Sequence, residues 1–263
     1  MKAVDEFARL KKDGRKISMV TAYDAWSARL VAQSNVDAIL VGDSVAMVIH
    51  GQATTLAATV DLMAVHTRAV ASAAAGKFLI ADLPFLSFRK GIPAAMNAVA
   101  ALVTVGAQSV KLEGVDGHED VIKHIVESGV PVMGHIGLTP QAVNHFGGFR
   151  VQGKTEDAAA KLLRQAHALE DLGCFSIVIE CVPAELAARI TSELTVPTIG
   201  IGAGIGTDGQ ILVLHDVWGL DKRHVPRFVR RYVDGERVLT DALNAYSADV
   251  KELRFPGSEE SYS

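Results

Sequence analysis

Short runs of branched apolar residues recur along the chain, each followed by a polar or glycine-rich break and then by a helical pattern. Because these runs are short and rich in Val and Ile, they favour strands over helices. The pattern predicts eight strands, over Ser18–Thr21, Ala38–Val41, Phe78–Ala81, Ser109–Leu112, Val132–Gly134, Ser176–Ile179, Thr198–Ile201 and Ile211–Leu214.

Helical periodicity fills the intervals between these strands. The clearest predicted helices cover Ala25–Gln33, Val60–Ala75, Pro93–Val105, Glu119–Glu127, Asp157–Leu172 and Ala184–Leu194. Pro93 and Pro183 suit first helical turns. After the last strand, Val225–Val250 is predicted to be largely helical and amphipathic, so that it would close the barrel or dock on a neighbouring subunit.

Strands that alternate with helices predict parallel pairing through right-handed crossovers. Eight such units indicate closure into an α/β (β/α)8 TIM barrel with a C-terminal helical extension, and an open doubly wound sheet is the alternative. The length of 263 residues and the hydrophobic content of 49% suit one domain with a sizeable core. We therefore expect a single barrel domain over residues 1–263.

Charge and cysteine content narrow the function classes. A formal net charge of -4 argues against a broad grip on nucleic acid or on an anionic membrane, but it allows a small anionic substrate. Cys174 and Cys181 lack CxxC spacing and a nearby histidine pair, so no zinc site is expected. Reduced thiols in a cytoplasmic protein are the expectation, with a disulfide as the alternative. The N-terminal stretch has no apolar core of the kind that a secretory signal needs.

Polar residues follow the predicted strands, at the barrel end where the active sites of such folds lie. Five successive strands, the second to the sixth, carry ionisable groups at or near these ends: Asp43, Asp82, Lys111 with Glu113, His135 and Glu180.

Asp43, Asp82 and Glu113 could converge on one spot. Three crowded carboxylates repel one another unless a cation neutralises them. Hard oxygen ligands without histidine or thiolate favour Mg2+, with Mn2+ as a substitute. The alternative is that each acid caps a helix or is solvated in a loop.

Three further residues have candidate roles in this region. Lys111 shares strand parity with Glu113, and inside a barrel it needs an anionic partner, either a substrate carboxylate or a structural ion pair with Glu113 or Asp82. His135 could donate to a ligand oxygen or be a hydrogen-bonded core histidine. Glu180 ends an apolar strand and is a candidate proton acceptor, or else a partner for a nearby cation.

Two glycine-containing segments follow predicted strands. Gly200–Gly206 lacks the full dinucleotide-binding pattern, so its glycines are expected to admit a ligand or a neighbouring loop. His135–Gly153 is long and glycine-rich, which is typical of a loop that closes over a site.

Several longer stretches match the motifs of a known family. They include TAYD at Thr21–Asp24, LVGDS at Leu40–Ser44, ADLPF at Ala81–Phe85 and VKLEG at Val110–Gly114, followed by GHIGLTPQ, FGGFRVQG, ECVP, GIGAG and TDGQILVLHD. On these motifs the chain resembles the ketopantoate hydroxymethyltransferase family of pantothenate biosynthesis. One departure is ATTLA at residues 53–57, where the family would carry a serine first and a proline last. None of the residues matched to the family's metal and substrate sites lies in this segment.

The resemblance implies a reaction and a set of site residues. The reaction joins the one-carbon unit of 5,10-methylenetetrahydrofolate to 3-methyl-2-oxobutanoate, giving 2-dehydropantoate and tetrahydrofolate. The matched residues are Asp43, Asp82 and Glu113 for Mg2+; Asp43, Ser44, Asp82 and Lys111 for the 2-oxoacid; Glu180 as the proton acceptor; and His135 as a histidine lining the site. A metal chelated by the 2-oxoacid would stabilise the enolate. Family members are usually cytoplasmic and commonly decameric, so the resemblance also implies a cytoplasmic homo-oligomer.

Two other classes of function remain as alternatives. A carbon–carbon lyase or mutase of the phosphoenolpyruvate mutase and isocitrate lyase kind would share a barrel and a Mg2+-bound 2-oxoacid. Those enzymes usually carry a catalytic cysteine loop after a middle strand, and Glu113–Gly117 contains no cysteine. A catalytically silent oligomeric scaffold would have no need of the matched acids, Lys111 or Glu180.

Overall fold

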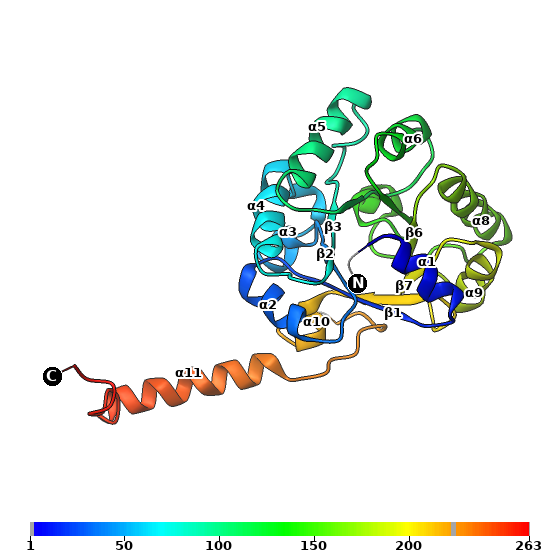
Figure 1. The fold of residues 1–263 in the computed structure, drawn as a ribbon. Coiled ribbons are helices and arrows are strands. Elements are labelled where there is room, and N and C mark those ends of the chain that lie inside the picture. Colours follow the sequence, from blue (N-terminus) through cyan, green and yellow to red (C-terminus); the bar gives the residue numbers. More distant parts are fainter. Residues whose placement is uncertain (1–2, 222–224, 263) are drawn as a thin grey trace. The chain divides into compact units, whose positions relative to one another are not determined.

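A closed parallel barrel forms the first compact unit of the chain, residues 1–212 (Figure 1). The structure is a computed structural model that describes residues 3–221 and 225–262. Strands β1 to β8 follow one another around the barrel in sequence order, and every neighbouring pair is parallel. The predicted (β/α)8 barrel is therefore confirmed, and the open doubly wound sheet is wrong.

The strands lie close to the predicted positions. They are β1 Ile17–Thr21, β2 Ala38–Val41, β3 Phe78–Asp82, β4 Ser109–Lys111, β5 Val132–Gly137, β6 Ser176–Glu180, β7 Thr198–Ile201 and β8 Gly209–Leu212. Strand β5 extends past the predicted end, so His135 lies within the strand rather than after it. Strand β8 begins earlier than predicted because Gly209 pairs with both Ile17 and Ile199.

Helices alternate with the strands around the barrel. They are α1 Asp5–Lys12, α2 Ala25–Gln33, α3 Val45–Val48, α4 Val60–Ala71, α5 Ile92–Val103, α6 Glu119–Glu127, α7 Val143–Phe146, α8 Glu156–Asp171 and α9 Ala184–Glu193, with short 3-10 turns η1 Thr55–Ala57 and η2 Pro140–Ala142. Side-chain caps fix three of the starts: Asp24, Thr59 and Thr155 each accept from a backbone N–H in the first turn. Pro183 is the N-cap of α9 rather than a residue of its first turn.

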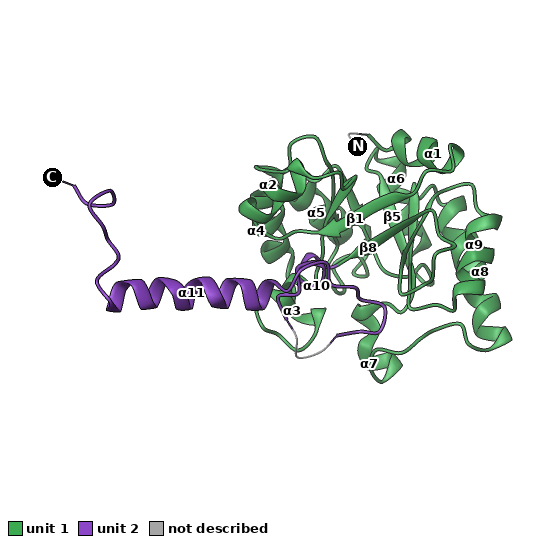
Figure 2. Cartoon of the chain, turned by 90° about the horizontal axis from the view of Figure 1, so that it is seen from below, with its two compact units in different colours: residues 1–212 green, residues 213–263 purple. Residues whose placement is uncertain are grey.

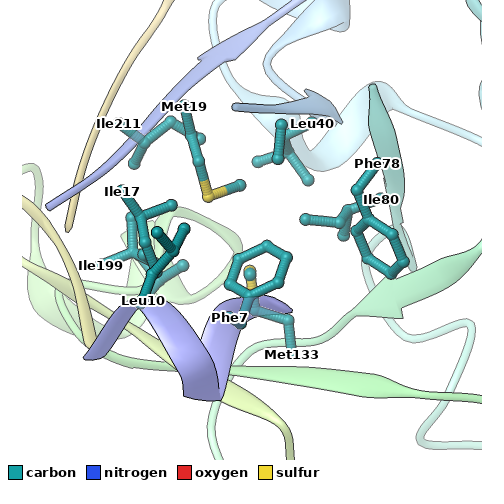
Figure 3. Packing of buried hydrophobic residues seen from close by; sticks show 12 residues of the cluster. Phe7, Leu10, Ile17, Met19, Leu40, Phe78, Ile80, Met133, Ile199 and Ile211 are labelled. Atoms are coloured by element: carbon teal, nitrogen blue, oxygen red, sulfur yellow. The ribbon is translucent and has the colours of Figure 1, made fainter. Parts of the chain in front are cut away.

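The barrel interior is filled by apolar side chains from the strands together with two from helix α1 (Figure 3). Phe7 and Leu10 of α1 are buried in the same cluster as Met19, Leu40 and Ile80, among others. The Phe7 ring also contacts two other aromatic rings, edge to face, at centroid distances of 5.5 and 5.1 Å. Helix α1, which the apolar pattern did not predict, thus completes the core.

The inward-facing rows of apolar side chains continue into polar side chains at the C-terminal end of the barrel. Along a strand, side chains two residues apart point to the same face. Ile80, Met133 and Val178 belong to the buried cluster, and two residues beyond them stand Asp82, His135 and Glu180. The side chains of these three polar residues therefore continue the inward-facing rows of the apolar core.

The second compact unit, residues 213–263, contains α10 Leu214–Trp218 and α11 Gly235–Lys251 (Figure 2). The predicted C-terminal helical extension is confirmed by α11, but this helix begins only at Gly235, so residues 225–234 of the predicted stretch are not helical. The reason is its N-cap, Asp234, which accepts from the Arg237 N–H at 3.4 Å. The expectation of one domain over residues 1–263 stays a prediction. No helix in the described part of the chain is long and apolar enough to cross a membrane.

We predict that Phe7→Ala lowers the free energy of unfolding by about 3–5 kcal/mol, because it leaves a cavity at the α1 end of the core. Urea unfolding followed by circular dichroism measures the change. Lys12→Ala on the exposed side of the same helix is the control and should stay within about 0.5 kcal/mol of the parent. Equal stability of the two variants would show that α1 contributes little to the core.

Candidate active site

The predicted site residues gather at the C-terminal end of the barrel. Asp43 and Ser44 follow β2, Asp82 ends β3, Lys111 ends β4 with Glu113 two residues on, His135 lies in β5 and Glu180 ends β6. All of them are buried except Ser44 and Glu180, which are half-buried. The structure thus brings together the whole predicted set, from five successive strands.

Lys111 and Asp82 form an ion pair at the centre of this set. The β3–β4 register pairs the two residues, and Lys111 Nζ lies 2.7 Å from Asp82 Oδ1. Their side chains are only 5% and 3% exposed. The other carboxylate oxygen, Asp82 Oδ2, accepts from the backbone N–H of Asp43 at 3.0 Å. The sequence left two kinds of partner open for Lys111, a substrate carboxylate or a structural ion pair with Glu113 or Asp82. This structure contains the ion pair with Asp82.

His135 stands between two carboxylates and the Lys111 ammonium group. Its Nδ1 lies 3.5 Å from Glu113 Oε1 and 3.3 Å from Lys111 Nζ, and its Nε2 lies 3.2 Å from Glu180 Oε2. Burial and the charge of Lys111 lower the pKa of His135, but Glu113 and Glu180 outweigh them and raise it to about 9. Although the Lys111 contact alone would suit a neutral ring, the two flanking carboxylates favour the imidazolium form.

Gln141 is a site residue that the sequence pattern did not reveal. Its side-chain Nε2 donates to Asp43 Oδ2 and to the Leu83 carbonyl, both at 2.9 Å. Its backbone N–H donates to Glu113 Oε2 at 2.9 Å. One buried residue of η2 thereby holds two of the three predicted metal-binding acids. Its place in the matched GHIGLTPQ stretch was the available signal.

Tyr23 is a second residue that the sequence pattern did not single out, although it belongs to the matched TAYD stretch. Its hydroxyl lies 2.7 Å from Ser44 Oγ. Burial raises the pKa of Tyr23 well above its ordinary value, so the phenol stays protonated and can donate to Ser44. When Tyr23 is the donor, the Ser44 hydroxyl hydrogen is left for another acceptor.

Burial and neighbouring charges shift the pKa values of the acids and of the lysine in this cluster. Burial, followed by the charges of Asp82 and Glu113, holds the pKa of Asp43 well above its ordinary value. Burial also raises the pKa of Asp82, against the opposing effect of Lys111. The same acids outweigh desolvation at Lys111 and raise its pKa. A further positive charge in this cluster would relieve the repulsion among the acids.

The donor chemistry of these acids fits a hard divalent cation. Asp82 Oδ1 is buried, and its contact with Lys111 lacks the angles of a hydrogen bond, so the oxygen keeps lone pairs for a cation. However, within residues 3–221 and 225–262 no three His, Cys, Asp or Glu side chains stand ready to share one metal ion. In this structure Lys111, Gln141 and His135 occupy the carboxylate oxygens, so a metal would have to replace some of these contacts.

A recess of about 310 Å³ opens beside the acids. Its lining includes Glu113 and Gln141 of the cluster and residues from the segments after β3 and β5. The segment after β5 contains η2 and α7, within the stretch predicted to close over the site. That closure stays a prediction.

A parallel barrel with buried acids, a lysine and a histidine at its C-terminal end defines an enzyme of the TIM-barrel class. Solved structures with this fold include a phosphonopyruvate hydrolase in complex with oxalate and Mg++, with a TM-score of 0.63 and 13% identity over 99% of this chain and 93% of that one. A 2,3-dimethylmalate lyase of the phosphoenolpyruvate mutase/isocitrate lyase superfamily has a TM-score of 0.61 and 15% identity over 100% of this chain and 91% of that one. At this identity they show the fold alone.

Sequence comparison is more specific. The family model for ketopantoate hydroxymethyltransferase matches residues 2–258. A 3-methyl-2-oxobutanoate hydroxymethyltransferase of Francisella tularensis subsp. tularensis is 52% identical over 262 residues, covering 100% of this chain and 99% of the relative. One from Coxiella burnetii is 51% identical over 255 residues, covering 97% and 96%. The chain belongs to the ketopantoate hydroxymethyltransferase family, as the resemblance predicted, and not to the lyase, mutase or scaffold alternatives.

We predict that Lys111→Met, assayed without divalent metal, lowers the free energy of unfolding by about 3–5 kcal/mol, because it leaves buried carboxylates uncompensated. Millimolar Mg2+ should restore part of the loss, as measured by thermal or urea unfolding. Lys161→Met is the matched control, since Lys161 pairs with Asp116 on the surface and its loss should cost less than about 1 kcal/mol. A Lys111→Met protein as stable as the control would mean that the acids are not compensated by this lysine.

Proposed function

We propose that this chain transfers a hydroxymethyl group from 5,10-methylenetetrahydrofolate to 3-methyl-2-oxobutanoate, giving 2-dehydropantoate and tetrahydrofolate, a step of pantothenate biosynthesis. The names of its full-length relatives support this reaction. The observation that carries the proposal is the buried Lys111–Asp82 pair among further acids, with Glu180 at their edge. This arrangement offers a cation for a substrate carboxylate, acids for a metal, and a base.

Asp43, Asp82 and Glu113 would hold Mg2+, or Mn2+ in its place, through hard carboxylate oxygens. When bound, the metal supplies Lewis-acid stabilisation of the negative charge that develops on the keto oxygen. Gln141 keeps Asp43 and Glu113 in place through hydrogen bonds from its side chain and its backbone.

Lys111 and Ser44 would bind the carboxylate of the 2-oxoacid. The Lys111 ammonium group is buried and charged, so it gains most from an anion that enters the same water-poor site. The Ser44 hydroxyl, supported by Tyr23 at 2.7 Å, donates a further hydrogen bond. Together they fix the acid end of the substrate and orient carbon 3.

Glu180 would accept the proton from carbon 3. Its side chain is 16% exposed, so it borders both the buried acids and the open side of the site. His135 Nε2 lies 3.2 Å from Oε2, and Oε1 of the same carboxylate would take the proton. The enolate carbon then forms a bond to the one-carbon unit, and both bonds from that unit to the two folate nitrogens break. Water supplies the hydroxyl group, and the two freed nitrogens take up the remaining proton of the water and the proton that Glu180 removed.

The proposed metal site can be tested by removing the metal or one of its acids. Chelation should abolish product formation, and added Mg2+ should restore it. Asp82→Ala should bind Mn2+ far more weakly than the parent, as measured by electron paramagnetic resonance, because it removes a buried oxygen donor. Asp120→Ala, an exposed acid on α6, is the control and should bind Mn2+ normally. Full activity of a metal-free preparation would refute the proposed metal.

The proposed role of Glu180 as the base can be tested by replacing its carboxylate with an amide. Glu180→Gln keeps the size of the side chain but removes the base, so exchange of the carbon 3 proton in D2O should fall by about two to four orders of magnitude. Product formation should fall with it, while binding of metal and 2-oxoacid stays near normal. NMR of 3-methyl-2-oxobutanoate without folate measures the exchange. Glu185→Gln, exposed in the first turn of α9, is the control. Exchange at the parent rate in Glu180→Gln would assign the base elsewhere.

Helix α11 supports the proposal of a homo-oligomer, with a decamer as the family-based expectation. Leu239, Leu243, Tyr246 and Val250 follow one another at helical spacing along one face, and all four are exposed within this chain. An apolar stripe of this kind needs a partner surface. We propose that the partner is another copy of the chain.

The proposed location is the cytoplasm, in keeping with two free thiols at Cys174 and Cys181.

The assembly prediction is a particle several times heavier than the 27.9 kDa chain, measured by multi-angle light scattering. Leu243→Asp should shift the mass downward at equal concentration, because it places a charge in the apolar stripe. Asn244→Asp adds the same charge beside the stripe and should leave the mass unchanged. A parent protein that remains a monomer at micromolar concentration would contradict the proposal.

A further inference from the structure

The recess beside the acid cluster has no role in the chemistry described so far. It measures about 310 Å³ and shares Glu113 and Gln141 with the cluster. Its other walls come from Phe85 and Arg89, in the segment between β3 and α5, and from Thr139, Asn144 and their neighbours after β5. The recess therefore touches the reaction centre at one end and opens to solvent at the other.

A two-substrate reaction needs such a space. The 2-oxoacid would occupy the region of Lys111 and Asp82, and the barrel beneath it is filled by the apolar core around Met133 and Val178. The second substrate must therefore approach carbon 3 from the loop side. Glu180 is not among the residues that line the recess. The base and the incoming electrophile can thus occupy different sides of the 2-oxoacid.

We propose that this recess binds the reduced pteridine ring of the one-carbon donor and presents its methylene carbon to the enolate. This assignment rests on the proposed hydroxymethyl transfer. Pockets for small ligands range from about 300 to 1,000 Å³, so the recess suits a bicyclic ring and leaves the tail of the donor outside.

Phe85 supplies a surface for stacking. Its side chain is large and apolar and yet 39% exposed at the wall of the recess. A flat heterocycle gains contact area and favourable ring geometry against such a face. Without a ligand, that face is left to water.

Polar groups around Phe85 suit the edge of a pterin, which carries an amino group, a ring N–H and a carbonyl oxygen. The Asn144 amide and the Thr139 hydroxyl make no side-chain hydrogen bond with residues 3–221 or 225–262. An amide can both donate to the carbonyl oxygen and accept from the ring N–H. These two groups are therefore available to read the ring.

The Arg89 guanidinium is fixed in place at the same wall of the recess. Its Nη2 donates to the Glu113 carbonyl at 3.2 Å and its Nη1 to the Asp116 carbonyl at 3.4 Å. The guanidinium also lies over the Phe88 ring, 5.4 Å from the centroid. A guanidinium has five N–H donors, so donors remain for the ring carbonyl oxygen. The anchoring contacts fix its orientation before a ligand arrives.

The test measures folate binding and the half-reaction of the other substrate in the same variants. Phe85→Ala and Asn144→Ala should each raise the dissociation constant of tetrahydrofolate by about tenfold, the size expected for the loss of one stacking or hydrogen-bonding partner. The KM for 5,10-methylenetetrahydrofolate should rise in parallel. Exchange of the carbon 3 proton without folate should stay within about twofold of the parent rate, because neither side chain is a hydrogen-bond or ion-pair partner of Lys111, Asp82 or Glu180.

Two further variants make the result specific. Phe85→Trp keeps a flat aromatic face and should bind tetrahydrofolate nearly as well as the parent. Lys90→Ala is the matched surface control, since Lys90 is exposed beside Arg89 and does not line the recess. Tetrahydrofolate binding that Phe85→Ala and Asn144→Ala leave unchanged would overturn the assignment of the recess alone. A parent protein that exchanges the proton but neither binds tetrahydrofolate nor forms product would overturn the proposed function itself.

Discussion

Several acids buried beside one lysine form the constraint on which the rest of the site depends. Carboxylates in a water-poor environment repel one another, and each needs a cation or hydrogen-bond donors to remain charged. The chain supplies these donors from distant segments: the Lys111 ammonium group, the Asp43 N–H and both the side chain and the backbone of Gln141. Burial and the charges of Asp82 and Glu113 nevertheless hold the pKa of Asp43 well above its ordinary value. A divalent cation near these acids would favour their charged forms.

The apolar core provides the rigid base for this cluster. Because side chains alternate along a strand, the rows that fill the barrel with Ile80, Met133 and Val178 end in Asp82, His135 and Glu180. Helix α1 fills the core from the other end through Phe7 and Leu10. Well-packed rows leave the polar side chains little freedom, so the distances between them are set by strand register rather than by loop conformation.

Local patterns predicted the barrel and the strand-end residues because both follow from short-range periodicity and strand parity. They could not predict Gln141, whose side chain meets Asp43 across 98 positions of sequence, since that contact depends on how a loop folds back. The role of Tyr23 was not predicted for a related reason: its hydroxyl reaches Ser44 from the segment between β1 and α2. The start of α11 was misplaced because Asp234 caps the helix well inside an amphipathic stretch. The convergence of Asp43, Asp82 and Glu113 on one ion stays a prediction, because it depends on side-chain contacts that the pattern does not encode.

If the site binds a metal and a 2-oxoacid as proposed, the Lys111–Asp82 pair explains how it can be stable without them. In the free protein each of the two charges compensates the other, at 2.7 Å. When a substrate carboxylate approaches Lys111, Asp82 loses part of its partner's charge and becomes a better ligand for a cation. When a cation approaches the acids, Lys111 is freed in turn to bind the carboxylate. Each ligand thus removes the electrostatic cost of binding the other, since an isolated buried charge costs several kcal/mol. Binding of the metal and of the 2-oxoacid should therefore be mutually reinforcing, by reciprocity of the coupling free energy. This coupling arises from one ion pair at adjacent strand ends and needs no movement of the barrel.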